Sequence, residues 1–403
     1  MKIRKLFFLA IITVLLGVVT TCEEEPDSSG TVSETVSEGD TPINIPGGTL
    51  VDKFEWLKSN VASNNNYIIE VANDEFINPQ YLYFSGRTNI TIQLKGIGGV
   101  KNIGINGSGS LFTIRNDVTL ILKENIVLNG SPYSILVDEG GGTFIMESGK
   151  IDRVCVEGGT FTMNGGEISY VSVSGTFIMN GGEISGNVGV DDDGTFIMEG
   201  GKISYVGVSG TFIMNGGEIS DNTAYGGNGV YVVADGTFTM NDGTITGHTN
   251  ASGGVCIEGG TFIMIGGTIS GNINYNPTIY GCGGGVCVSG GTFVMSGGEI
   301  AGNTSSYGGG GVYIMVFSYK NTNFRKTGGI ITGYSSDNVN GNVVKDSDGN
   351  ILNNRGHAIY VYFNDDNFIR FKDTTVGEQD NLSYVSNGLN PPTISGVWDE
   401  LDE

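Results

Sequence analysis

The chain contains little proline, histidine or tryptophan and few basic side chains. Its 403 residues include 8 prolines, 2 histidines and 2 tryptophans. So few prolines argue against a disordered chain rich in Pro and Gly, and the absence of a Gly-x-y register excludes collagen. The 20 Lys and Arg are outnumbered by 43 Asp and Glu, which leaves a formal net charge of −23. Such a surface repels phosphate groups, so nucleic acid is not an expected partner.

Cysteine is also scarce, whereas glycine is abundant. The 5 cysteines do not form two pairs with the spacing of a zinc site, so a zinc-stabilised fold is not expected. The chain has 68 glycines, and 38% of its residues are hydrophobic. Glycine at this level, in a chain with enough apolar residues for a core, is typical of a fold with many tight turns at fixed places.

The first residues predict export from the cell. Residues 1–5 are basic, residues 6–19 are almost entirely apolar, and Cys22 precedes a polar run. This is the layout of a secretory signal, and the apolar run is short for a membrane span. The cysteine resembles the lipidation site of bacterial lipoproteins. We therefore expect residues 1–21 to be a lipoprotein signal peptide and Cys22 to carry the lipid, with an ordinary signal peptide and a chance cysteine as the alternative.

A short unit with the pattern T-F-x-M-x-G-G-x-I recurs through the centre of the chain. Eight of the 10 methionines occupy its Met position, and a ninth, degenerate copy has Lys326 there, where we expect the interior column to end. Successive copies begin 16 to 31 residues apart, which indicates a solenoid. The eight copies begin at Thr143, Thr160, Thr176, Thr195, Thr211, Thr237, Thr261 and Thr292.

The unit predicts stacked parallel strands. Phe and Met, two residues apart, face the same side of a strand, the Gly pair turns the chain, and the Ile points inward from the next face. Burying three such side chains contributes roughly 5–9 kcal/mol, whereas ordering ~16 residues costs on the order of 16–30 kcal/mol. One copy is therefore unstable alone, and we expect copies to stack about 4.8 Å apart. The predicted core columns include Phe177, Met179, Ile184, Phe212, Met214 and Ile219.

We therefore predict an all-β, single-stranded parallel β-helix with an N-terminal capping helix over residues 50–62, which Thr49 begins. The longer copies are expected to hold loops at one corner. The predicted parts are a flexible tether (22–48), an N-terminal cap with the first rungs (49–130), the repeats (131–335), a C-terminal cap (336–387) and a loose acidic tail (388–403).

The repeats resemble the glycine-rich repeats of bacterial surface proteins that have a right-handed parallel β-helix of the pectin-lyase-like class. The segment K-F-E-W-L-K-S-N, from Lys53 to Asn60, and the residues around it from 50 to 130 resemble spirochaete-type surface lipoproteins. The resemblance covers roughly residues 49–335. It implies the handedness of the helix and a place on the cell surface, but it implies no single activity.

Enzymes of this fold class usually cleave acidic polysaccharides with clustered carboxylates, often with Ca²⁺, and a basic residue. Between Thr143 and Ile300 there are 15 acidic residues but only three basic ones, Lys150, Arg153 and Lys202. No catalytic set can be transferred to these residues. A calcium-assisted polysaccharide lyase or hydrolase is therefore the alternative function. Its calcium candidates are Asp191, Asp192 and Asp193, which otherwise form a solvated turn.

Three further columns are predicted to be structural. Cys155, Cys256 and Cys287 occupy one position of the repeat and are expected to be small buried side chains, with a disulfide between Cys256 and Cys287 as the alternative. His248 and His357 are assigned no role. Two positions of the repeat are expected to line outer surfaces. The position before the inward Ile holds Lys150, Glu167, Glu183, Lys202 and Glu218. The position before the Gly pair holds Asn164, Asn180, Asn215 and Asn241.

The predicted function is a non-enzymatic, lipid-anchored scaffold or adhesin-like binding module, expected at the outer membrane or cell surface. No cofactor is expected, with calcium as the alternative. The partners are the membrane, through the lipid, and a host or neighbouring protein or glycan. Aromatic side chains in the longer copies are candidate contacts, because they can stack on sugars or on proteins. They are Tyr231, Tyr280, Tyr307 and Tyr313.

Overall fold

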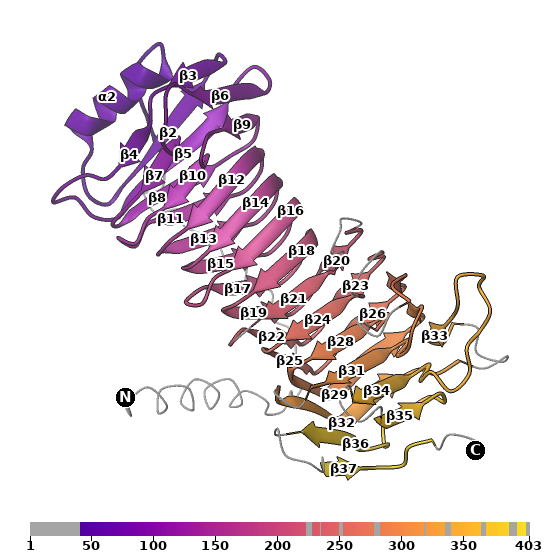
Figure 1. Cartoon of the computed structure of the whole chain (residues 1–403). Coiled ribbons are helices and arrows are strands. Elements are labelled where there is room, and N and C mark those ends of the chain that lie inside the picture. Colours follow the sequence, from indigo (N-terminus) through magenta and orange to yellow (C-terminus); the bar gives the residue numbers. More distant parts are fainter. Residues whose placement is uncertain are drawn as a thin grey trace, which may run out of the picture. The chain divides into compact units, whose positions relative to one another are not determined.

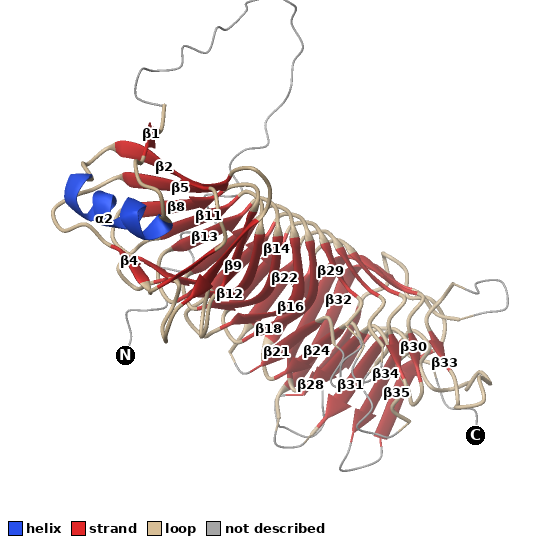
Figure 2. Cartoon of the chain, turned by 90° about the horizontal axis from the view of Figure 1, so that it is seen from above, coloured by secondary structure: helices blue, strands red, loops and turns tan. Residues whose placement is uncertain are grey.

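The computed structural model describes residues 41–222, 228–233, 235–249, 253–277, 283–317, 320–334, 340–363, 368–386 and 393–399. Over these residues the protein consists of strands with one helix near the N-terminal side. The chain runs in successive coils, here called rungs, and each rung crosses three strand positions. Strands at the same position pair in parallel from one rung to the next (Figures 1 and 2). The predicted parallel β-helix is confirmed.

The first strand position, here called the Phe face, carries the T-F-x-M segment. Phe and Met point inward, while Thr and the residue between Phe and Met point outward. The last two strands of this face continue around the corner into the next face. The Phe face comprises β2 (Asn65–Val71), β5 (Ile90–Gly96), β8 (Val118–Leu122), β11 (Thr143–Met146), β13 (Thr160–Met163), β15 (Thr176–Met179), β17 (Thr195–Met198), β19 (Thr211–Met214), β22 (Thr237–Met240), β25 (Thr261–Met264), β29 (Gly291–Ala301) and β32 (Thr322–Ile331). 

The second position, here called the Ile face, follows the Gly pair. In the short rungs its strands continue into the third position, so one strand serves both. The Ile face comprises β3 (Glu75–Ile77), β6 (Lys101–Ile105), β9 (Ile126–Asn129), the first parts of β12 (Lys150–Val156), β14 (Glu167–Val173), β16 (Glu183–Val190) and β18 (Lys202–Val208), and then β20 (Glu218–Ser220), β23 (Thr244–Thr246) and β26 (Thr268–Ser270).

The third position, here called the Val face, supplies two further inward side chains to each rung. In β14 these are Val171 and Val173, both buried. A rung therefore buries five side chains, and the expectation of three was too low. Besides the second parts of β12 to β18, the Val face comprises β4 (Gln80–Leu82), β7 (Phe112–Ile114), β10 (Ile135–Val137), β21 (Val230–Val233), β24 (Val255–Glu258), β28 (Val286–Ser289), β31 (Val312–Val316) and β34 (Ile359–Phe363).

The interior columns are continuous. The Phe rings from Phe144 to Phe293 stack with successive centroids 4.6 to 4.9 Å apart, which matches the spacing of paired strands. Met pairs with Met and Ile with Ile in the same register. All six side chains named as core from the sequence are fully buried, which confirms that prediction: Phe177, Met179, Ile184, Phe212, Met214 and Ile219.

The second glycine of each Gly pair makes the corner between the Phe and Ile faces. Gly217 is representative: its φ is +85°, a conformation that side chains with a Cβ avoid. A Cβ on Gly217 would also lie 2.5 Å from Cε of Met198 and 2.8 Å from the carbonyl oxygen of Gly201, both in the preceding rung. The glycine is therefore required twice, for the turn and for the packing of the methionine column.

Helix α2 (Leu50–Asn60) covers the N-terminal end of the interior. Thr49 begins it with a capping box, in which its side chain accepts from the Asp52 amide and the Asp52 carboxylate accepts from the Thr49 amide. Phe54 is buried against the ring of Phe112, with centroids 5.6 Å apart. Strand β1 (Ile43–Asn44) pairs with β2 and extends the Phe face. The predicted helix and its N-cap are confirmed.

At the C-terminal end the parallel pairing changes to antiparallel. Strand β35 (Phe368–Lys372) pairs with β34, β36 (Leu382–Ser386) pairs with β32, and β37 (Thr393–Ser395) pairs with β36. The Asp399 amide also donates to the Phe371 carbonyl. Residues 393–399 therefore belong to the cap, and the prediction of a loose tail from 388 to 403 was wrong for this segment.

Lys326 ends the methionine column, as predicted, and is fully buried. Its Nζ donates to the carbonyl oxygens of Gly377, at 2.6 Å, and Asp380, at 3.1 Å. Burial lowers the pKa of Lys326, against the opposing influence of the Asp380 and Glu378 carboxylates. The lysine thus links the last repeat to the cap by hydrogen bonds instead of apolar packing.

The additional residues of the long rungs lie between the Ile face and the Val face, as expected for loops at one corner. They also contain regular structure that the sequence did not suggest. Strands β27 (Ile273–Asn274), β30 (Thr304–Ser305) and β33 (Val343–Val344) form a separate three-stranded parallel sheet. Successive insertions therefore stack on one another in the same manner as the rungs that carry them.

Candidate functional site

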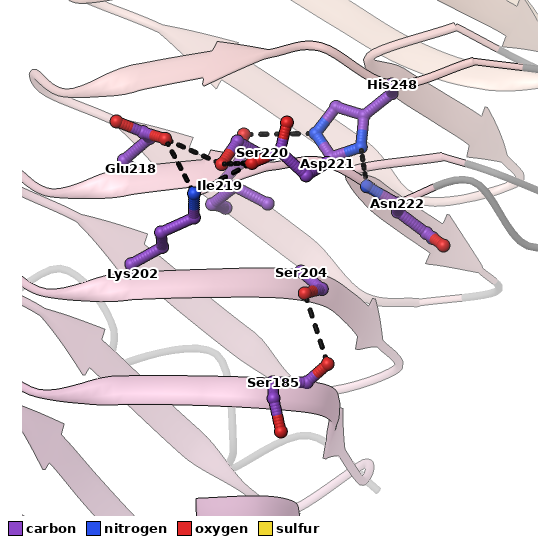
Figure 3. Close-up of polar contacts among 9 residues, drawn as sticks. All are labelled: Ser185, Lys202, Ser204, Glu218, Ile219, Ser220, Asp221, Asn222 and His248. Carbon is purple, nitrogen blue, oxygen red and sulfur yellow. Dashed lines mark hydrogen bonds and ion pairs between the residues drawn. The ribbon is translucent and has the colours of Figure 1, made fainter. Parts of the chain in front are cut away.

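The charged column predicted for the outer surface of the Ile face is in register, and its lysines are paired. Nζ of Lys150 lies 3.0 Å from Oε2 of Glu167. Nζ of Lys202 lies 2.7 Å from Oδ2 of Asp221 and 3.4 Å from Oε1 of Glu218 (Figure 3). The hydrogen bond between Lys202 and Asp221 raises the pKa of Lys202 and lowers the pKa of Asp221. These exposed pairs stabilise little, so the column patterns the surface.

Ser220, Asp221 and His248 bring together the residue types of a nucleophilic site, but their geometry does not serve one. Ser220 Oγ donates to Glu218 Oε1 at 2.6 Å and lies 3.1 Å from Asp221 Oδ2. The His248 ring instead faces the backbone: Nε2 lies 3.0 Å from the Ile219 carbonyl oxygen, and Nδ1 accepts from the Asn222 amide at 3.3 Å (Figure 3). With both ring nitrogens engaged, His248 cannot take a proton from Ser220.

His248 is the first member of a buried side-chain ladder that the sequence analysis missed. Its other members are Asn272, Asn303 and Asn342, all fully buried. Nδ2 of Asn272 donates to the carbonyl oxygen of Ile245, in the preceding rung, at 3.1 Å, and Oδ1 accepts from the His248 amide at 3.1 Å. Asn303 and Asn342 repeat this pattern one rung further along each time.

The imidazole of His248 reproduces the hydrogen bonds of an asparagine side chain. Nε2 of His248 faces the Ile219 carbonyl of the preceding rung, as Nδ2 of each asparagine faces an isoleucine carbonyl. Nδ1 of His248 accepts a hydrogen bond from a backbone amide of that rung, as Oδ1 of each asparagine does. This arrangement requires the neutral ring with a proton on Nε2. Burial lowers the pKa of His248, which favours that neutral form. The pattern I-[STA]-G-[NH] precedes His248, Asn272 and Asn303, but it also occurs at Ile184, where Asn187 is exposed, so it is only a partial signal.

Asp191, Asp192 and Asp193 lie in an exposed turn between the Val face and the Phe face. Asp191 accepts a hydrogen bond from Ser174 Oγ at 2.8 Å. Over the part of the chain that the structure describes, no group of three or more His, Cys, Asp or Glu is arranged to hold a metal ion. The three carboxylates are therefore not gathered into a preformed site, and calcium binding here stays a prediction.

The tyrosines predicted as binding contacts mostly pack on one another. Tyr313 lies in β31, is fully buried and stacks on Tyr360, with ring centroids 5.9 Å apart, so its assignment to a binding loop was wrong. Tyr307 packs edge-on against the Tyr313 ring. Tyr231 is half-buried, and its hydroxyl donates to the Glu258 carboxylate. Tyr280 and Cys22 lie outside the described residues. Binding by Tyr231 and Tyr307 stays a prediction.

Cys256 and Cys287 face each other on β24 and β28, in the outward column of the Val face. Both are buried, with Tyr313 next in the column. Cys155 occupies the same column several rungs earlier, and burial, followed by the Glu157 charge, raises its pKa to about 11. The prediction of small buried side chains in one column is confirmed. All three are thiols in the structure, so the alternative disulfide is not formed.

A recess of about 380 Å³ opens on the Val face beside Tyr133, Arg153 and Tyr170. The guanidinium carbon of Arg153 lies 5.2 Å from the centroid of the Tyr170 ring. This cation–π contact engages one face of the ring, although Tyr170 stays 44% exposed.

A larger groove, of about 500 Å³, opens on the Ile face at its N-terminal end, where β3, β6 and β9 lie side by side (Figure 1). Phe76 stands on its wall with 72% of its surface exposed, although its neighbours in β3 are partly or fully covered. Its lining includes Asp74, Phe76, Asn102, Gly104, Asn129 and Asp152. The volume of this groove lies in the range of sites that hold small ligands, and the exposed ring gives it an apolar wall.

No protein-family model, curated protein or solved structure matches this chain. Among the helices of the described residues, none has the length and apolar character needed to cross a membrane. The β-helix and the groove beside Phe76 are thus the grounds on which a function can be proposed.

Proposed function

We propose that this chain is an exported, lipid-anchored β-helix of the cell surface that binds a host or neighbouring macromolecule without chemical change. The leader pattern of residues 1–21 and Cys22 support export and anchoring. The formal net charge of −23 supports a partner other than nucleic acid. Attachment at the outer membrane or cell surface is part of the proposal.

The observation that carries the binding role is the groove beside Phe76. The Phe76 ring is 72% exposed beside carboxylates and amides, so the groove offers an apolar face and hydrogen-bonding groups together. The rigid rungs hold this groove in one shape, because every strand that lines it pairs with the next one in register. A preformed site loses less conformational entropy on binding than a mobile one.

Two side chains that could perform acid–base chemistry in the central rungs are engaged in other contacts. Lys202 is paired with Asp221 and Glu218, and His248 is bonded to the backbone through both ring nitrogens. These contacts support a scaffold role for the central rungs.

The anchor can be tested in cells by metabolic labelling with a palmitate analogue, combined with proteolysis of intact cells. We expect the wild-type chain to be labelled and cleaved at the surface, and the Cys22→Ala variant to lose the label. Labelling that persists in the variant, or a chain that remains protected from protease, would overturn the proposed address.

The absence of chemistry can be tested by incubating the protein with polyuronates, with and without Ca²⁺, and measuring chain length. We expect no cleavage. Cleavage that disappears when Asp191, Asp192 and Asp193 are replaced together by Asn would establish the lyase or hydrolase instead.

A further inference from the structure

Phe76 is held in place by its own strand and by a glycine. A Cβ added to Gly104, the paired residue in β6, would lie 2.5 Å from Cε1 and 2.6 Å from Cδ1 of the Phe76 ring, so the ring rests directly on the Gly104 backbone. Strand β3 is fixed on its other side, because the Glu75 carboxylate accepts from the Leu50 amide at the start of α2. The ring is therefore supported on one side and open on the other.

The polar groups around the ring are also fixed. The Asp74 carboxylate accepts from the Asn102 amide at 2.9 Å and from Asn102 Nδ2 at 3.2 Å, and these bonds lower the pKa of Asp74. Asn129 follows Gly104 in the register, and Asp152 follows next in the outward column of the Ile face. Carboxylates and amides at the edge of an aromatic ring are the usual partners of sugar hydroxyl groups.

The charge of the groove selects among sugars. Its lining contains the carboxylates of Asp74 and Asp152 and no Lys or Arg, although Arg153 Nε, outside the lining, lies 3.8 Å from Asp152 Oδ2. In a chain with a formal net charge of −23, this lining repels a uronate or sulfate group. The apolar ring accepts the C–H side of a pyranose, which carries no charge. A volume of about 500 Å³ is in the usual range for sites that hold a small ligand.

We propose that this groove binds a neutral oligosaccharide, with one sugar ring stacked on Phe76 and its hydroxyl groups bonded to Asp74, Asn129 and Asp152. The inference rests on the proposed binding function and names its ligand class. It assigns the site to the first rungs of the β-helix, outside the T-F-x-M repeats. The acidic polysaccharides expected for an enzyme of this fold class are excluded as ligands by the same carboxylates.

The test is isothermal titration of the full-length, detergent-solubilised protein with three probes: a β-1,4-glucan tetramer, a mannan tetramer and a galacturonan tetramer. We expect at least one neutral tetramer to bind and the galacturonan not to bind. Phe76→Ala should weaken binding roughly tenfold or more, equivalent to about 1.4 kcal/mol or more. Tyr81→Ala is the matched control, because Tyr81 is 65% exposed on the Val face and does not line the groove.

A second variant tests the placement of the ring without removing it. Gly104 does not have a positive φ, so Gly104→Ala leaves the backbone unstrained and only displaces the exposed Phe76 ring. We expect this variant to keep the thermal stability of the wild type and to lose sugar affinity. Equal affinity in Phe76→Ala, Gly104→Ala and wild type, or preference for galacturonan, would overturn the inference.

These outcomes are distinguishable from failure of the proposed function. If the neutral tetramers do not bind but intact cells still capture a surface protein through a contact that Phe76→Ala abolishes, the binding function stands and the saccharide assignment is wrong. If the chain is not exposed on cells, the function fails whatever the titration shows.

Discussion

At the scale of single residues, the glycine at each corner is held in place by two independent requirements. We predict that Gly217→Ala destabilises the protein by about 2–5 kcal/mol, because alanine resists a φ of +85° and its Cβ would overlap Met198. Chemical unfolding followed by circular dichroism measures the loss. Gly189→Ala is the control, since a Cβ there meets nothing within 4 Å and φ is not positive. Equal losses in both variants would contradict the explanation.

Substitutions on the inward and outward sides of one strand should also differ sharply in their effect on stability. In β19, Phe212 is fully buried and Ile213 faces outward. Phe212→Ala is expected to cost about 3–5 kcal/mol, whereas Ile213→Thr should cost less than about 0.5 kcal/mol, because threonine already occupies that position in β13 and β22. Thermal unfolding of the two variants compares them directly. A small effect of Phe212→Ala would mean that the stacked rings are not the core.

At the scale of elements, the buried ladder makes stability depend on pH through His248. Its pKa is lowered in the folded protein, so the unfolded chain binds the extra proton between that lowered value and the ordinary value of 6.5. Stability should therefore fall as pH falls through this window. His248→Asn, which restores the residue type of the next rungs, should fold and reduce this dependence. Denaturant midpoints at pH 7 and pH 5 test it, with His357 unchanged in both proteins.

If both proteins lost the same stability between those pH values, His248 would not be the titrating member of the ladder. The comparison is sensitive because the asparagine can make the same two backbone hydrogen bonds and carries no proton in this range.

The repeats were predictable from the sequence because three marker residues, Phe, Met and Gly-Gly, recur in a fixed frame. The Val face was underestimated, since its V-x-V segment lies at variable distance from that frame and its residues are common in any strand. The ladder was missed for a related reason: Asn272 and Asn303 look like turn residues after glycine, and only their stacking shows that they are buried.

The candidate site could not be predicted from the sequence. Asp74, Asn102 and Asn129 are separated by 25 to 30 residues and precede the regular repeats, so their proximity depends on the register of three short strands. Phe76 alternates with partly or fully covered neighbours, which is the ordinary pattern of a strand, and its large exposure is visible only in the folded chain. Conversely, Tyr313 was assigned to a loop because it lies at the end of the insertion of a longer copy.

At the scale of the whole molecule, the caps should keep the stack from growing. Ending the chain at Gly333 removes β33 to β37 and uncovers the edges of β30, β31 and β32. Unpaired edges pair with other chains, so we expect this truncated protein to associate end to end in a concentration-dependent manner. Light scattering compares it with the full chain at equal concentration. An unchanged particle size would show that the cap is dispensable for this purpose.

The antiparallel strands of that cap also explain why Lys326 can be buried. Its ammonium group donates hydrogen bonds to carbonyl oxygens that belong to the cap. The truncated chain would leave this charge at an open end, where water replaces the lost acceptors.

The position of the insertions has a consequence for how this protein can change over generations. The longest extra segments of the long rungs leave the coil between the Ile face and the Val face, while the five inward side chains of the rung keep their register. Outside the buried ladder and the strands β27, β30 and β33, mutation can therefore lengthen, shorten or rewrite that one corner while the coils above and below keep their pairing. The molecule has a constant interior and one edge that is free to diversify, the arrangement expected when an outer surface must vary faster than the framework that displays it.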